Sequence, residues 1–177
     1  MADGLLYKKD TDFVRDNMLI NYCLGDDESL LIESFVRNNG ICLRFDVGHF
    51  YFFMTGTHKK FVTGYTPMTF SEGVDGALAI YDLMLETLRR NGFDGNAFLV
   101  KTDNSKQVGV LFSPGENAAC PADEMAQKML DAYTRAKDPY PVSGEDCTST
   151  SFVGPFSGYD RIHTAFVQAR ALNDLIF

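Results

Sequence analysis

The chain has 177 residues, of which 45% are hydrophobic and 23% charged, and its formal net charge is −8. This composition suffices for one sizeable core and argues against a disordered or fibrous chain. Such an acidic balance lacks the cationic surface of most nucleic-acid binders, so we expect no DNA binding by these residues alone. Apolar runs such as 50–54 fall far short of the ~20 residues that cross a bilayer, and the N-terminus does not have the order of a signal peptide. We therefore expect a soluble, cytoplasmic protein without membrane contact.

The residue types that most often bind metals or carry redox chemistry are few and scattered. Four cysteines contain no C-x-x-C pair, which predicts reduced and mostly buried thiols; they are Cys23, Cys42, Cys120 and Cys147. The three histidines, His49, His58 and His163, are too dispersed to form a ligand set by spacing. The sequence predicts no metal site and no cofactor.

The first 38 residues are predicted to form a helical segment. Apolar residues fall on one face of each of two helices, Phe13, Val14, Met18 and Leu19 in the first and Leu30, Leu31 and Phe35 in the second. Gly40 suits the position that ends the second helix. An amphipathic segment outside a sheet commonly covers its own core or pairs with a partner subunit. We hypothesise that residues 10–38 contribute to a homodimer contact.

A long strand is predicted from Ile41 to Phe53. Apolar and polar residues alternate at first, the end at 50–53 is almost wholly aromatic, and Gly48 indicates a bend or bulge. We expect the aromatic end to fill the core on both faces of a sheet rather than to line a ligand pocket. The stretch 57–69 has turn chemistry and is predicted to be a loop.

A helix and a hairpin are predicted next. Residues 69–72 fit the capping box and Gly92 fits a helix stop, with Ala77, Ile80, Met84 and Leu88 on one face between them. The β-prone runs 97–101 and 107–112 are separated by turn-forming residues, which predicts an antiparallel hairpin.

The last third is predicted to be helix, strand and helix. Pro121 suits the first position of a helix that ends at Asp138, with Met125, Met129 and Ala132 on one face. Residues 139–141 should be extended, 147–153 should form a strand, and Gly154 to Gly158 is interpreted as a turn.

The final helix is expected to run from about Tyr159 to the end. It would bury one face made of Ile162, Phe166, Ala169, Leu172 and Ile176. The chain stops on an apolar triplet without a glycine or basic residue to close the helix. We therefore expect the natural protein to continue past Phe177.

The order strand, helix, hairpin, helix, strand, helix favours an α+β fold. We expect a largely antiparallel sheet with packed helices, preceded by the N-terminal helices. The nucleotidyl-cyclase palm is one fold of this kind.

Residues 39–177 resemble the degenerate GGDEF-like regions that precede AraC-type helix-turn-helix domains in bacterial transcription regulators. Ser149–Gly154 looks like the family's "siGis" strand, and 159–177 looks like its closing helix, with Ala165, Gln168, Ala169 and Ala171. The resemblance implies that 39–177 is one compact regulatory domain, which the predicted N-terminal helical segment, 1–38, precedes. It also implies that DNA is contacted only by a C-terminal helix-turn-helix domain that is absent from this sequence.

The residues that a diguanylate cyclase needs are poorly matched. Such an enzyme holds two Mg²⁺ ions with carboxylates and uses a Gly-Gly turn beside the substrate. Residues 44–50 are similar to its first metal-binding strand, with Asp46 at the first aspartate, but Gly48 replaces the second carboxylate. The hairpin turn at 102–107 has no glycine pair. Asp46 is therefore interpreted as a structural or solvent-facing residue, and no catalytic, cofactor-binding or metal-binding residue is predicted.

The predicted function is a non-catalytic sensory or dimerisation domain of an AraC-type transcription regulator, acting as a homodimer. A small-molecule effector, with unassigned binding residues, would act through different affinities for two conformations. Two alternatives are kept. One is a divergent nucleotidyl cyclase or phosphodiesterase-like enzyme in which Asp46 holds metal, and the other is a stand-alone small-molecule-binding module.

Overall fold

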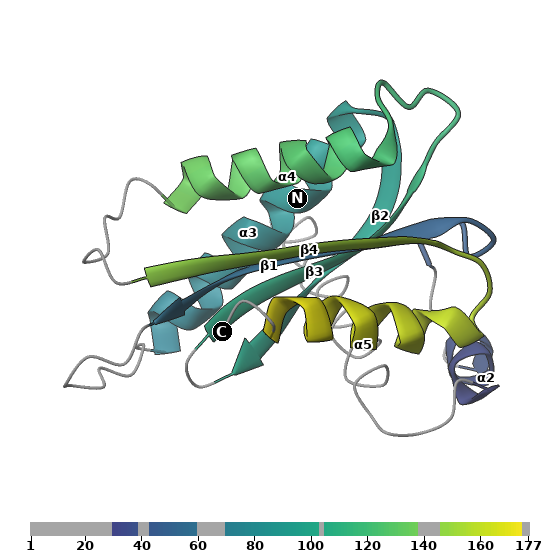
Figure 1. Cartoon of the computed structure of the whole chain (residues 1–177), viewed down its shortest axis with the longest axis horizontal. Helices are drawn as coiled ribbons and strands as arrows, with labels where there is room; N and C mark the ends of the chain where they lie inside the picture. Colours follow the sequence, from purple (N-terminus) through teal and green to yellow (C-terminus); the bar gives the residue numbers. More distant parts are fainter. Residues whose placement is uncertain (1–29, 39–42, 60–69, 103–104, 138–145, 175–177) are drawn as a thin grey trace, which may run out of the picture.

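The computed structural model describes residues 30–38, 43–59, 70–102, 105–137 and 146–174. Helices and strands follow one another along the chain in a mixed order (Figure 1). They are α2 (Leu30–Asn38), β1 (Phe50–Lys59), α3 (Phe70–Arg90), β2 (Phe93–Thr102), β3 (Ser105–Pro114), α4 (Ala122–Lys137), β4 (Asp146–Phe156) and α5 (Asp160–Asp174).

The strands form one antiparallel sheet in the order β2-β3-β1-β4. The chain passes from β1 through α3 to β2 and then from β3 through α4 to β4, and in each case another strand lies between the two connected strands. This is the split βαβ arrangement of ferredoxin-like folds. The predicted α+β class with a largely antiparallel sheet is confirmed.

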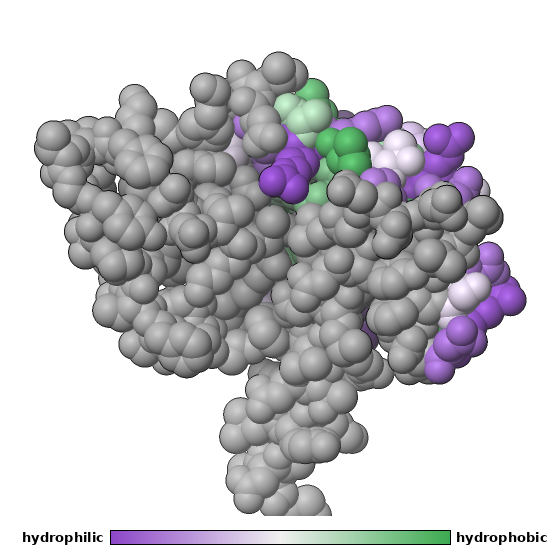
Figure 2. All heavy atoms as spheres, turned by 90° about the horizontal axis from the view of Figure 1, so that it is seen from below, coloured by the Kyte–Doolittle hydropathy of each residue, from purple (hydrophilic) through white to green (hydrophobic). Residues whose placement is uncertain are grey.

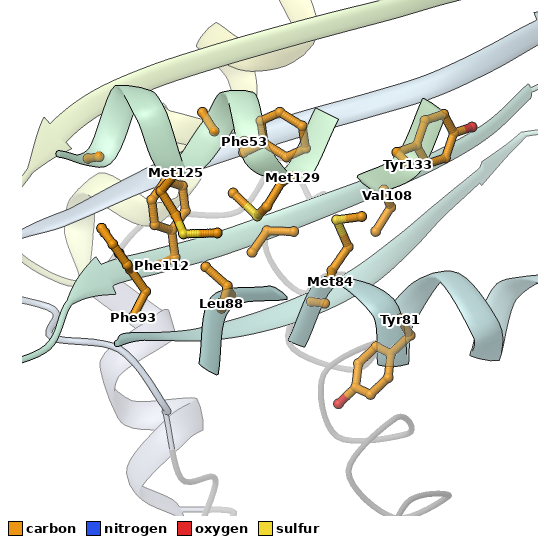
Figure 3. Packing of buried hydrophobic residues seen from close by; sticks show 14 residues of the cluster. Phe53, Tyr81, Met84, Leu88, Phe93, Val108, Phe112, Met125, Met129 and Tyr133 are labelled. Atoms are coloured by element: carbon orange, nitrogen blue, oxygen red, sulfur yellow. The ribbon is translucent and has the colours of Figure 1, made fainter. Parts of the chain in front are cut away.

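Helices α3 and α4 cover one face of the sheet, which we call the α3/α4 face. Figure 3 shows Met84 and Leu88 of α3 and Met125 and Met129 of α4 directed into the space between the helices and the strands. These side chains form one buried cluster that includes Phe53, Tyr81, Met84, Leu88, Phe93, Val108, Phe112, Met125, Met129 and Tyr133. The predicted apolar faces of both helices are confirmed by four buried residues, Met84, Leu88, Met125 and Met129. Burial of this apolar stripe against the sheet stabilises each helix.

Helices α5 and α2 lie on the other face of the sheet, the α5/α2 face (Figure 1). The buried cluster there joins aromatic rings of the strands to smaller side chains of α5, and it includes Val36, Phe45, Phe50, Phe52, Met54, Phe98, Leu111, Ile162, Ala165, Phe166 and Ala169. Phe52 and Phe53 are adjacent in β1 and point to opposite faces, as the pleat requires. The prediction that the aromatic run fills the core on both faces is confirmed for these residues.

Residues 43–49 do not form the predicted first part of a strand, since β1 begins only at Phe50. The alternation of apolar residues predicts a strand. In the structure Phe45 is buried, and Leu43 and Val47 pack against the α5/α2 cluster, but residues 43–49 do not pair with a strand. The backbone N–H of Arg44 donates to Asn96 Oδ1 at 2.8 Å, and that of Asp46 donates to Ser113 Oγ at 2.8 Å. Side chains of β2 and β3 thus replace the strand partner.

Two predicted turn regions are partly strand. Thr57 to Lys59 extend β1, because they pair with β3 or β4 or both. Gly154 to Phe156 belong to the predicted turn, but in the structure they extend β4. The register of β4 shifts opposite Phe50–Phe52, as in a β-bulge, so the glycine and proline continue the strand after a local irregularity. The predicted bend near Gly48 lies outside the ladder.

The buried face of α5 differs from the predicted one at its last turn. Ile162, Phe166 and Ala169 are buried as expected, whereas Leu172 is 43% exposed and Asn173 is buried in its place. Val167 is also exposed on this helix. Viewed from below, the described surface shows a small hydrophobic patch beside hydrophilic side chains (Figure 2).

The hairpin and the stop of α3 agree with prediction. β2 and β3 pair from Phe93↔Pro114 to Thr102↔Ser105, and Gly92 adopts a φ of 74° after the helix. The predictions for 1–29, Gly40, the rest of 57–69 and 139–141 lie outside the described residues. None of the helices in the described ranges is long and apolar enough to cross a membrane.

Candidate functional site

An open groove of about 360 Å³ lies beside the C-terminal half of α3. Two parts of the chain that are distant in the sequence build it: the extended stretch before β1, and the consecutive segment made of helix α3 and the start of β2. Its charged side chains are Arg44, Asp82, Glu86, Arg89 and Asp94, and Phe93 is among its apolar residues. We take this groove as the candidate ligand-binding site.

Helix α3 supplies one wall because two of its faces have different partners. Tyr81 and Leu88 are almost fully buried in the α3/α4 cluster, while Asp82 and Arg89 are exposed. Spacings of four and three residues place Asp82, Glu86 and Arg89 along one side of the helix. A Cβ at Gly95 would lie 2.6 Å from Leu88 Cδ1, so the glycine allows α3 to approach β2 closely.

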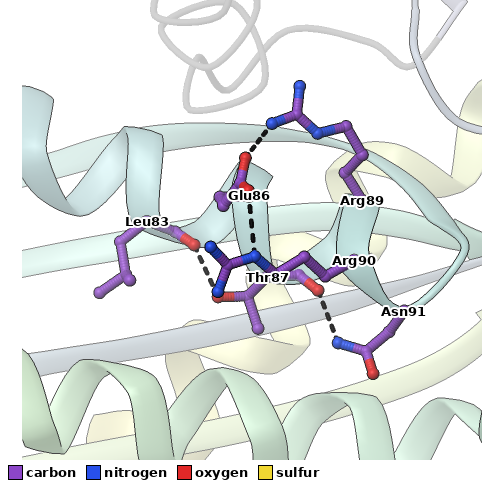
Figure 4. A network of polar contacts seen from close by, with 6 residues as sticks. All are labelled: Leu83, Glu86, Thr87, Arg89, Arg90 and Asn91. Atoms are coloured by element: carbon purple, nitrogen blue, oxygen red, sulfur yellow. Dashed lines mark hydrogen bonds and ion pairs between the residues drawn. The ribbon is translucent and has the colours of Figure 1, made fainter.

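A polar network fixes the C-terminal turns of α3 (Figure 4). Glu86 accepts from both arginines, Arg90 Nε lies 3.0 Å from Glu86 Oε1, and Arg89 pairs with Glu86 Oε2. Thr87 Oγ1 donates to Leu83 O at 2.7 Å, and Asn91 Nδ2 donates to Thr87 O at 2.8 Å. Two guanidinium groups near the helix C-terminus are also favourable for the helix dipole. One carboxylate therefore positions two arginines, one of which lines the groove.

Arg44 reaches the groove from the segment that crosses the α5/α2 face. Its backbone is held by the buried Asn96 side chain, while its own side chain is exposed. The groove thus combines two guanidinium donors, three carboxylate acceptors and two buried rings. Such a mixed set suits reversible binding of a small polar molecule that carries both donors and acceptors.

Asp46 lies in the turn before β1, and its carboxylate is used locally. Asp46 Oδ1 accepts from the backbone N–H of Gly48 at 2.8 Å, and the side chain is exposed. The β1–β3 ladder runs from Tyr51↔Phe112 to His58↔Ser105, so the hairpin turn lies at the other end of β1. Seven residues at ~3.3 Å each separate the two ends by ~23 Å. The structure does not bring Asp46 and the hairpin turn together.

The histidines and cysteines are also separate. His49 is exposed and contacts Tyr51, whose hydroxyl lies 3.4 Å from His49 Nε2, and His163 is partly buried on α5. Cys120 is a free, partly buried thiol. Across the described ranges, no three His, Cys, Asp or Glu side chains are grouped so that they could hold a metal ion. The side chains of His58 and Cys147 and all of Cys23 and Cys42 lie outside the described residues.

Sequence reasoning did not find the groove. In the sequence, Arg44 belongs to the stretch around Asp46, and Asp82, Glu86 and Arg89 lie in a predicted helix without forming a recognisable motif. The spacing of Asp82, Glu86 and Arg89 along the helix predicted before Gly92 is the signal that indicates one charged side. The contribution of Arg44 depends on the tertiary arrangement.

Comparison with known proteins gives no family for the chain. No family model matches it, and no curated protein matches it either. A crystal structure of a provisionally named amidohydrolase/peptidase from Burkholderia cenocepacia is similar in part, with 16% sequence identity and a TM-score of 0.39. The match covers 78% of this chain and 37% of that one. A likeness at this level carries no argument about the activity of this chain.

Proposed function

We propose that this chain is the non-catalytic sensory or dimerisation domain of a cytoplasmic AraC-type transcription regulator. In this proposal, DNA contact belongs to a helix-turn-helix domain that follows residue 177 in the natural protein. The proposal rests on the family resemblance of residues 39–177 and on the arrangement of the described residues.

The observation that carries the proposal is the position of Asp46. An active cyclase needs its metal carboxylates beside the glycine turn that approaches the triphosphate. Here the carboxylate accepts from Gly48 and lies at the opposite end of β1 from the hairpin turn. This supports a domain in which the segment around Asp46 serves the fold, and it does not favour the enzyme alternative.

The groove supports a sensory role. A ligand held between Arg44 and Arg89 would touch the segment before β1 and the end of α3 at once. Such a ligand would shift the protein between conformations only if it binds them with different affinities. The same groove would serve a stand-alone binding module, which differs from the proposal in lacking a DNA-binding domain.

The test is operator binding by the natural full-length protein. We expect its gene to continue into two helix-turn-helix units, and we expect deletion of residues 1–177 to change DNA affinity, measured by fluorescence anisotropy at fixed salt. Unchanged affinity after the deletion would overturn the regulatory role. A gene without helix-turn-helix units would favour the stand-alone module.

A further inference from the structure

We infer that the outer edge of β4 is a homodimer interface, in which two copies join their sheets antiparallel across a two-fold axis at Thr150. β4 ends the strand order β2-β3-β1-β4, and it lies between α4 and α5 in Figure 1. Within the described ranges, β1 is the strand that pairs with it. The inference gives the dimerisation part of the proposed function its interface and rests on that part, whereas the sensory and DNA-binding parts are tested separately by operator binding.

The two edges of the sheet differ in how well they resist pairing. Proteins commonly protect edge strands with charges, prolines, bulges or covering segments. β2 carries the charged residues Asp94 and Lys101, and the side chain of its Asn96 accepts a hydrogen bond from the backbone N–H of Arg44. β4 has no charged residue from Cys147 to Phe156, and its proline comes only at position 155, beside the register shift. The stretch 147–153 is therefore a long, uncharged edge.

The peptide groups of Thr150 point away from β1. Thr150 is the partner of Thr55, and the two hydroxyl oxygens are 3.0 Å apart. Close side chains are typical of the non-hydrogen-bonded pairs of an antiparallel ladder, whose N–H and C=O groups face outward. Thr150 and Phe152 are both partly exposed, while Ser149 and Ser151 are buried. The peptide groups of an antiparallel strand point alternately toward each neighbouring strand, so those of residues 148, 150 and 152 point outward from this edge.

A second copy of the same strand fits this edge. With the axis at Thr150, residue 148 of one copy faces Phe152 of the other, and the outward groups form three hydrogen-bonded pairs, about six bonds. This register uses the whole regular stretch and stops where β4 becomes irregular. Asp146 faces Gly154 of the other copy rather than its own equivalent. Two chains with a net charge of −8 can therefore meet here without opposed like charges in the ladder.

The aromatic residues near this edge support the same partner. Tyr51, Phe112 and Phe152 come from three adjacent strands and stack, with Phe152 centred 5.5 Å from Tyr51 and 6.1 Å from Phe112. Phe152 is the ring on the outermost strand and is partly exposed. In the dimer, the β-branched residue 148 of the other copy extends this row, and aromatic and β-branched cross-strand pairs are favourable.

Sedimentation velocity of the full chain tests the inference first. We expect a concentration-dependent species of twice the 19.8 kDa monomer mass. Thr150→Pro removes an outward N–H and should give a monomer, with far-UV circular dichroism confirming that the chain still folds. A wild-type chain that stays monomeric at all concentrations overturns the inference.

Disulfide trapping tests it without depending on a proline. Residues of a hydrogen-bonded pair have Cα atoms about 5.5 Å apart, within reach of a disulfide. Thr150→Cys should give a covalent dimer under mild oxidation, with mass spectrometry mapping the link to position 150 in both copies. Ser157→Cys, an exposed position beyond β4, is the matched control and should give no covalent dimer. Equal cross-linking of the two variants, or a dimer without the link at 150, would contradict this interface.

Discussion

The two faces of the sheet are built by different means. On the α3/α4 face, two regular helices bury large side chains such as Met84 and Met129 against the strands. On the α5/α2 face, a non-helical segment lies beside α5, and the side chains of Asn96 and Ser113 satisfy its backbone. That face also buries polar groups without partners among the described residues, Ser151 Oγ and the Asn173 amide. The first face follows from periodicity, whereas the second depends on tertiary hydrogen bonds.

The largest expected effects come from Phe52 and Phe53, which are adjacent and buried on opposite faces. Phe52 contacts the rings of Phe98 and Phe166, with centroids 5.6 and 6.0 Å away. Phe52→Ala should destabilise the protein by about 4–5 kcal/mol, because rigid rings fill a cavity poorly. Phe53→Ala should cost about 3 kcal/mol, because flexible methionines in that cluster can partly refill the space.

Urea denaturation of both variants measures this difference. Equal losses, or a larger loss for Phe53→Ala, would contradict the proposed contrast between the two faces. A change in the denaturant slope would indicate that the unfolded or native state has changed in compactness as well.

Removing the side-chain acceptors of the irregular segment should have a smaller, local effect. Asn96→Ala leaves the N–H of Arg44 without its partner and should cost about 1–2 kcal/mol. Hydrogen exchange should accelerate at Arg44 and its neighbours, while α3 and α4 keep their protection. Ser113→Ala is the matched variant, because it removes the acceptor of the backbone N–H of Asp46. Uniform acceleration over the whole chain would show that the segment does not open separately.

The smallest expected effect has the opposite sign. Ser151→Ala removes a buried hydroxyl that has no hydrogen-bond partner among the described residues, and it should raise stability by up to about 1 kcal/mol. Ser149→Ala is the control, since Ser149 is buried on the same strand but does have an interaction partner. Thermal unfolding should therefore shift upward for the first variant and not for the second. A lower melting temperature for Ser151→Ala would mean that its hydroxyl is satisfied.

Much of the fold could be predicted because its regular elements carry strong periodic signals. The stripe through Met84 and Leu88 and the β-prone runs around the hairpin turn depend on local spacing, and both predictions are confirmed. Leu172 was placed on the buried side of α5 because hydrophobicity was the criterion. The helix instead buries Asn173, which a hydrophobic pattern does not select.

The segment 43–49 and the groove could not be predicted for a shared reason. Alternation at Leu43, Phe45 and Val47 correctly indicates which side chains face inward, but it does not say whether the backbone pairs with a strand or with side chains. The groove joins Arg44 to the consecutive segment of α3 and early β2 through tertiary structure alone. No local motif carries that information.

Nucleotide turnover tests the proposed non-catalytic role most directly. The chain should be incubated with GTP or ATP and Mg²⁺, with product measured by chromatography for the wild type and for Asp46→Asn. We expect neither protein to form cyclic or dinucleotide product above a protein-free control, because the Asp46 carboxylate serves its own turn, far from the hairpin. Product formed by the wild type and lost in Asp46→Asn would contradict the account.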